Sequence, residues 1–248
     1  MKNYTLHKIV VTILLATFII SCSNKDTTDI ITSSINKDFS ITQTNAIYDN
    51  VLEQIIMSID VEEVAGNTVP TPIGKTDGAP VLGYVFPTSL KTTDVGFNAI
   101  NGIVALALTS HPDFDDTPLW DENNDTNYQN DGIVWHPHWV ILNNDTRIKG
   151  NLSVVEFDSN KTTVMLPPTN PGMPMYMDSP GYQVIQRGST IKVVFPAAAV
   201  NHVTDFNFDA VTAFLKVNTS NPDLPLLGVY EVYDIASKDL SLPYTIQN

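Results

Sequence analysis

Two histidines and two tryptophans share one short run, Trp135-His-Pro-His-Trp139. Side chains alternate along a strand, so His136 and His138 would share one face and the tryptophans the other. Two imidazoles on one face can share a metal ion, and zinc or copper suits such ligands. Pro137 cannot donate to a sheet ladder, which predicts that this run lies at a sheet edge or a bulge, near solvent.

Further ligands for this metal site are expected from the acidic segment 110–131. His111 begins that segment, and His111 and Asp113 share a side in an extended chain. With His136 and His138 they would form a zinc or copper site, and His202 is an alternative fourth ligand. Because His-x-His also occurs by chance, the competing interpretation is a pair of half-buried histidines hydrogen-bonded beside core tryptophans.

The same acidic segment contains a calcium-like pattern. Asp121, Asn123 and Asp125 alternate, as oxygen ligands do in the first half of an EF-hand loop. The pattern resembles the loops of EF-hand and dockerin-like modules over about seven residues. Thr126 stands where such loops have glycine, and Gly132 where they have the closing glutamate. The alternative is a solvated acidic loop without an ion.

Three methionines, Met173, Met175 and Met177, alternate along a proline-rich segment. Thioethers on one side are soft ligands for cuprous copper, but methionines also simply fill gaps in a core. Near the acidic segment, Trp120 and Tyr128 offer aromatic surfaces on which a sugar could stack. A surface module for glycans or a protein partner is therefore the competing functional hypothesis.

The first residues are typical of an export signal. Lys2 and Lys8 precede an apolar run that ends in Ile19-Ile20-Ser21-Cys22. This tetrapeptide resembles the lipobox of bacterial lipoproteins. The resemblance implies removal of residues 1–21, acylation of Cys22 and anchoring of the protein to the bacterial cell envelope through lipid. In the lipoproteins of enteric bacteria, an aspartate directly after the acylated cysteine favours retention in the inner membrane. This chain has Ser23 at that position, so the outer membrane is the expected location.

Composition narrows the function further. The formal net charge of −14 disfavours nucleic acid as a partner. A single cysteine excludes an intramolecular disulfide. The sequence shows no Gly-x-Ser-x-Gly elbow, phosphate loop or His-Glu-x-x-His motif. An enzyme is therefore less expected than a binding protein, and its simplest form would use a metal held by His111, His136 and His138.

The elements expected to position these residues are strands. A polar tether is predicted for residues 22–44 and an all-β domain, a single β-sandwich or jelly-roll-like fold, for residues 45–248. A minor alternative places a helix at 46–57. Ten short runs rich in β-branched and aromatic residues carry the strand prediction: 51–64, 81–86, 102–109, 132–142, 152–157, 162–166, 182–185, 190–195, 210–217 and 227–233.

Together these features predict a lipid-anchored, non-catalytic, metal-binding β-protein of the cell envelope. Calcium would lie in the acidic segment, and zinc or copper beside His136 and His138. The membrane, through the N-terminal lipid, and metal ions are the expected partners.

Overall fold

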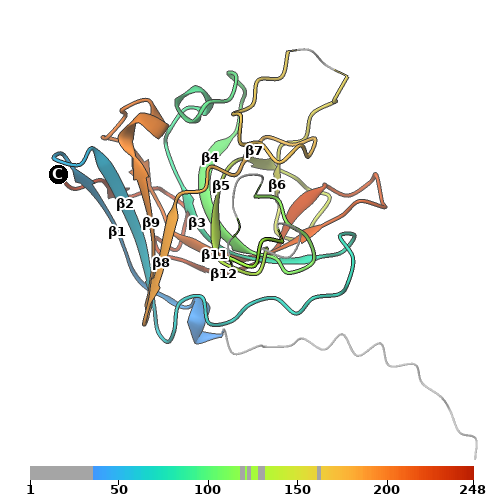
Figure 1. Ribbon diagram of the computed structural model, residues 1–248, viewed down its shortest axis with the longest axis horizontal. Coiled ribbons are helices and arrows are strands. Elements are labelled where there is room, and N and C mark those ends of the chain that lie inside the picture. Colours follow the sequence, from blue (N-terminus) through green and yellow to red (C-terminus); the bar gives the residue numbers. More distant parts are fainter. Residues whose placement is uncertain (1–35, 118–120, 122–123, 128–131, 161–162) are drawn as a thin grey trace, which may run out of the picture. The chain divides into compact units, whose positions relative to one another are not determined.

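Antiparallel strands build the fold of this chain. The computed structural model describes residues 36–117, 121, 124–127, 132–160 and 163–248. Within these residues there are thirteen strands and three 3-10 helices of three or four residues each, so the all-β prediction is confirmed. The strands form two main sheets, which lie side by side in Figure 1.

The smaller main sheet has four antiparallel strands in the order β1-β2-β9-β8. The central strands β2 and β9 alternate buried and more exposed residues, as a sheet with one covered face requires. In β2 every second residue is buried, from Ile55 to Val61. The strands are β1 (Ile41–Asp49), β2 (Gln54–Val61), β8 (Gln183–Arg187) and β9 (Thr190–Pro196).

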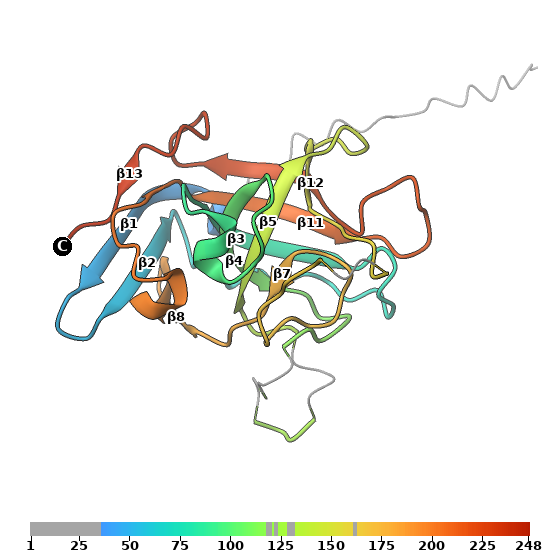
Figure 2. The ribbon, with the colours of Figure 1, turned by 90° about the horizontal axis from the view of Figure 1, so that it is seen from above.

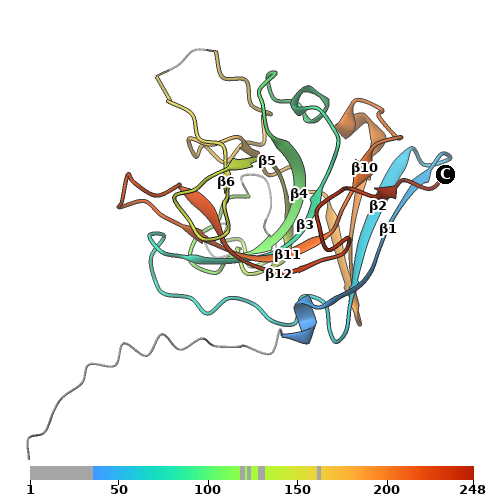
Figure 3. The ribbon, with the colours of Figure 1, turned by 180° about the vertical axis from the view of Figure 1, so that it is seen from behind.

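The larger sheet closes on itself. Its order is β4-β3-β11-β12-β6-β5-β7, and the additional pairing of β4 with β5 completes a ring of six antiparallel strands. The ring is visible in Figures 1 and 3, and Figure 2 shows its strands from another direction. Its strands are β3 (Pro80–Pro87), β4 (Ile103–Ser110), β5 (His136–Asn144), β6 (Leu152–Val154), β11 (Val211–Val217) and β12 (Leu227–Ile235), with β7 (Met177–Asp178) attached to β5.

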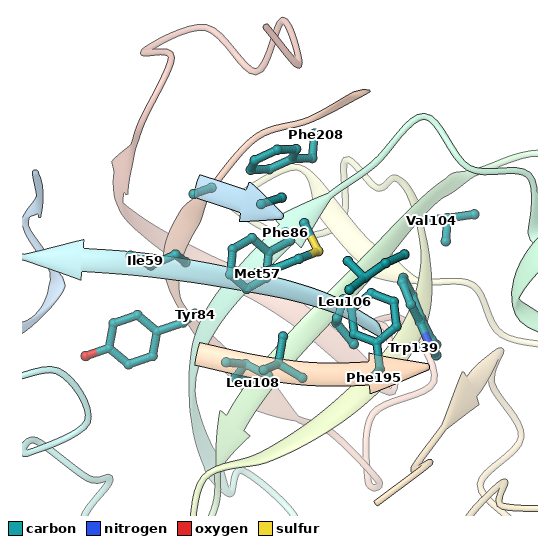
Figure 4. Packing of buried hydrophobic residues seen from close by; sticks show 14 of the residues in the cluster. Met57, Ile59, Tyr84, Phe86, Val104, Leu106, Leu108, Trp139, Phe195 and Phe208 are labelled. Atoms are coloured by element: carbon teal, nitrogen blue, oxygen red, sulfur yellow. The ribbon is translucent and has the colours of Figure 1, made fainter. Parts of the chain in front are cut away.

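One core fills the space between the two sheets. Met57 and Phe195 of the smaller sheet face the outer side of the closed sheet, where Phe86, Leu106 and Trp139 are buried (Figure 4). This face-to-face packing is that of a sandwich in which one layer is closed.

A second core lies inside the closed sheet. The inward residues of β4 and β11, such as Ala105, Ala107 and Ala213, are small, and valines and leucines accompany them. Because β4 presents apolar residues to both faces, its sequence is a continuous apolar run, as in strands covered on both sides.

Two expectations about the N-terminal part need correction. The proposed helix at 46–57 is a hairpin of β1 and β2, with Tyr48 opposite Ile55. Regular structure also begins before residue 45, inside the expected tether. Phe39 is buried, and its carbonyl accepts a hydrogen bond from Thr212 Oγ1 at 2.6 Å.

The remaining elements are short and link the sheets. The described residues, from 36 to 248, form one compact unit. No strand forms over the described residues 163–166, contrary to the strand predicted at 162–166. The short elements are η1 (Lys37–Phe39), η2 (Thr92–Val95), η3 (Ala197–Val200) and the paired strands β10 (Asn207–Phe208) and β13 (Tyr244–Thr245).

Candidate metal centre

Pairing of β4 with β5 brings three histidines together. In this pairing Thr109 stands opposite His136, and Ala107 opposite His138. His111 follows β4 directly and is two residues beyond Thr109, so it continues the same inward face. Its N–H donates to the Gly132 carbonyl at 2.5 Å, which extends the contact between the two segments past the end of the strands.

The two tryptophans anchor the opposite face of the same run, as strand alternation predicts. Trp135 and Trp139 both belong to the core between the sheets. Trp135 Nε1 donates to the Gly66 carbonyl at 2.9 Å, and Trp139 Nε1 donates to the Tyr182 hydroxyl at 3.2 Å. With both indoles fixed, the imidazoles between them are directed into the closed sheet.

Pro137 does not place the run near solvent, contrary to the expectation. It is buried, with Leu108 of β4 opposite it. On its other side β5 begins to pair with β7 only at Trp139. Pro137 is thus near the first residue of a covered strand, one of the positions where a missing N–H is tolerated. The histidines beside it are consequently buried.

Asp116 is the fourth member of the group, and the sequence analysis did not select it. Its Oδ1 lies 3.2 Å from His111 Nε2, 3.3 Å from His136 Nε2 and 3.5 Å from His138 Nε2. All four residues are at most 7% exposed. One ligand atom from each lies within 4.8 Å of all the others, so the group can hold a metal ion.

The loop conformation that delivers Asp116 is held by its neighbours. His111 stacks on the Phe114 ring with centroids 4.2 Å apart, and its Nδ1 lies 2.9 Å from the Phe114 carbonyl. Asp115 Oδ1 accepts hydrogen bonds from the N–H and hydroxyl of Thr117. These contacts turn the chain back over His111, and Asp116 meets the imidazoles.

The hydrogen bonds of the imidazoles determine which nitrogens can bind a metal. His111 Nδ1 faces the Phe114 carbonyl, and His136 Nδ1 faces the Val134 carbonyl at 2.6 Å. A carbonyl only accepts, so both Nδ1 atoms carry the proton and, in the neutral rings, both Nε2 atoms present lone pairs. These Nε2 atoms are only 2.8 Å apart. A proton shared between them or a nearby cation removes the repulsion.

His138 and Asp116 also carry the protonation states that a metal requires. Burial lowers the pKa of His138 to about 3, so its imidazole is neutral at neutral pH. Burial alone would raise the pKa of Asp116, but the contacts of its carboxylate with the three surrounding imidazoles hold it well below its usual range. Among the described residues, Asp116 Oδ1 and His138 Nε2 have no hydrogen-bond partner.

The distances from Asp116 Oδ1 to the three imidazoles agree with a small transition-metal ion, whereas the 2.8 Å between His111 Nε2 and His136 Nε2 is shorter than such an ion would set. Tetrahedral bonds of about 2.1 Å place neighbouring ligand atoms about 3.4 Å apart. The Asp116 contacts of 3.2 to 3.5 Å match this separation. Outside the ring of ligands, His138 Nδ1 contacts Ser179 Oγ at 2.9 Å. Such outer contacts orient ligating imidazoles.

An apolar cavity of about 300 Å³ adjoins the group inside the closed sheet. His111, Asp116 and His138 line it, together with valines, leucines and alanines from the second core. Met173, Met175 and Met177 line the same cavity. Their role as soft-metal ligands stays a prediction.

The other predicted ligands lie elsewhere. Asp113 is not part of the His111 group, because its Oδ1 accepts hydrogen bonds from the N–H groups of Ile73 and Gly74. His202 is exposed in the turn after η3. Neither residue supplies the fourth ligand that the sequence analysis assigned to it.

The side chains of Asp121 and Asp125, the described carboxylates of the calcium-like pattern, accept hydrogen bonds from backbone N–H groups of the same segment. Asp121 accepts hydrogen bonds from the N–H groups of Asp125 and Thr126, and Asp125 Oδ1 accepts one from Asn127. Among the described residues only the histidine group brings three or more metal-binding side chains together. The calcium site stays a prediction. Outside the described residues lie Cys22, Asn123, Trp120 and Tyr128.

Fold and site together define an all-β protein in which three buried histidines and one buried aspartate can hold a metal ion. Comparisons of the chain with protein-family models, with curated proteins and with solved structures found no match. No helix in the described part of the chain has the length and apolar character needed to cross a membrane.

Proposed function

We propose that this protein binds one zinc ion through His111, His136, His138 and Asp116. The observation that carries the proposal is the convergence of three imidazole Nε2 atoms and one carboxylate oxygen in a fully buried position. Lone pairs and a negative charge that face one another in a buried position are stabilised by a cation among them. A metal ion supplies that charge and a bond to each atom.

The ligand set favours zinc over the other ions considered. Three nitrogens and one oxygen are a ligand set typical of zinc, and imidazole also suits copper. Calcium takes six to eight oxygen ligands, so it does not suit this group. A calcium ion would have to bind separately in the acidic segment, as the sequence predicts.

The second part of the proposal concerns location. We infer from Ile19-Ile20-Ser21-Cys22 that the protein is lipid-anchored through Cys22 in a bacterial envelope, with the outer membrane as the expected site. The acidic chain would raise the local concentration of cations there. An intact Met1 and an unmodified Cys22 thiol in the mass spectrum of native protein would contradict this part.

Zinc titration of the purified protein tests the metal centre. After removal of bound metal with a chelator, we expect wild-type protein to bind one zinc ion per chain by calorimetry. His138→Gln keeps a polar side chain of similar reach but loses the imidazole ligand, so zinc affinity should fall by about 100-fold or more.

His202→Gln is the matched control, because His202 is exposed and away from the group. It should bind zinc as wild type does. Equal affinity for zinc in His138→Gln and wild type, with both folded by circular dichroism, would overturn the metal centre. So would a wild-type protein that binds neither zinc nor copper.

A further inference from the structure

The four residues His111, Asp116, His136 and His138 are called the metal group below. The cavity beside the metal group extends along the inside of the closed sheet. On β4 its lining runs from Ile103 through Ala107 to Thr109, and His111 lies two residues further along the chain. The six-residue step from Ile103 to Thr109 corresponds to about 20 Å. At the end away from the histidines it reaches Ser89 and Leu242. The cavity is therefore elongated, with the metal group at one end and a different rim at the other.

Small inward side chains create this space. A closed sheet of so few strands normally fills its interior with side chains. Here Ala107 of β4 and Ala213 of β11 both face inward and line the cavity. An apolar cavity of about 300 Å³ leaves its lining atoms without packing partners, which is unfavourable unless a molecule occupies it. The lining favours an apolar occupant, and Met175 and Met177 give its wall adaptable side chains.

The charge of the metal group indicates which chemical group the occupant carries at the end nearest the metal ion. A divalent ion with three neutral imidazoles and the Asp116 carboxylate keeps one positive charge in a buried, apolar setting. A single anionic group would neutralise it at short range. His111, Asp116 and His138 line the cavity whereas His136 does not, so the ion would be reached from the cavity side. Zinc can expand from four ligands to five, as it does in some catalytic sites.

We propose that the cavity binds a medium-chain aliphatic carboxylate whose carboxylate group coordinates the metal ion. This inference rests on the proposed zinc centre. The cavity has about twice the volume of the engineered 150 Å³ cavity that holds benzene, a molecule of six carbons. It thus accommodates about a dozen non-hydrogen atoms, the size of octanoate or decanoate.

Calorimetry with sodium alkanoates tests the proposal on wild-type protein. Zinc-loaded protein should bind octanoate, and metal-free protein should bind it at least about 10-fold more weakly. 1-Octanol, which has the same chain without the charge, should also bind zinc-loaded protein more weakly. From hexanoate to decanoate the affinity should rise about fourfold per methylene, because each one is buried, and hexadecanoate should lose this gain because the cavity is too short.

Ala213→Phe fills the cavity from β11, away from the metal ligands, which lie on β5 and in the segment after β4. It should bind one zinc ion but lose at least about 10-fold in octanoate affinity. Ala198→Phe, an exposed position in η3, is the matched control and should behave as wild type. If Ala213→Phe does not fold, the chain-length series decides alone.

The outcomes separate the two proposals. Zinc binding without octanoate binding, or octanoate binding that is equal with and without zinc, overturns this inference and leaves the zinc centre intact. A chain-length series without an optimum also overturns it. Failure to bind any transition metal overturns both proposals together.

Discussion

Two backbone carbonyls determine the chemistry of the group at the scale of single residues. By accepting the Nδ1 protons of His111 and His136, they direct both Nε2 lone pairs at Asp116 Oδ1. Neighbouring carbonyls of this kind fix the tautomer in metal sites. The same two contacts also hold the rings at the orientation in which their Nε2 atoms meet.

Asp116→Asn should lower zinc affinity by about 100-fold or more, because the amide keeps the shape of the carboxylate but loses the charge that faces three imidazoles. Calorimetric zinc titration of the folded variant measures the effect. Asp115→Asn is the control: it makes the same change one residue away, and its amide oxygen can still accept the hydrogen bonds from Thr117 that hold the loop. Equal zinc affinities for the two variants would contradict the role assigned to Asp116.

The histidines were predictable from sequence because they lie on or directly after strands. Alternation alone places His136 and His138 on one face. Asp116 was not predictable as a ligand from the sequence. Asp113 and Asp116 both lie in a loop whose conformation depends on contacts with distant residues. Asp113 is held by the N–H groups of Ile73 and Gly74, about forty positions earlier in the chain. Such contacts leave no periodic pattern in the sequence, so they could not be predicted from it.

At the scale of elements, the loop between β4 and β5 controls the metal group. Gly132 stands where a side chain has no room: a Cβ atom there would lie 2.2 Å from the Phe114 carbonyl oxygen and 2.3 Å from that of His111. It would also lie 2.7 Å from His111 Nδ1. Close backbone approach of this kind requires glycine.

Gly132→Ala should therefore displace His111 and weaken zinc binding by at least about 10-fold, since its imidazole loses the position set by Phe114. The measurement is a zinc titration together with a thermal melt. Gly172→Ala, where no atom lies within 4 Å of the added Cβ, should lose some stability through its positive φ but bind zinc normally. Normal zinc binding by Gly132→Ala would mean that the loop does not position His111.

The positions of most long strands could be predicted from composition, but which strands pair with one another could not. The predicted runs at 81–86, 102–109, 190–195 and 210–217 correspond to β3, β4, β9 and β11 within one or two residues. Strand pairing is non-local, however: β4 meets β5 across the long acidic segment, and β12 meets β6. The closure of the larger sheet depends on those two pairings. The strands that were missed are the two-residue strands β7, β10 and β13 and the nine-residue β1, which fell in the expected tether and the alternative helix.

At the scale of the whole molecule, stability and binding belong to different cores. The core between the sheets holds the large aromatic residues, including Trp139, Phe195 and Phe208. The core inside the closed sheet contains the cavity and meets the metal group. Strands β3, β4 and β5 serve both, with one face in each core. A rigid outer layer can thus hold the binding site open inside the closed sheet.

The central claim is that His111, His136, His138 and Asp116 bind one transition-metal ion. X-ray absorption at the zinc edge of the zinc-loaded protein tests it most directly. We expect a first shell of three nitrogens and one oxygen at about 2.0–2.2 Å, with the outer scattering of three imidazole rings. A shell of six oxygens without imidazole scattering, or the same spectrum from the His138→Gln variant, would contradict the claim.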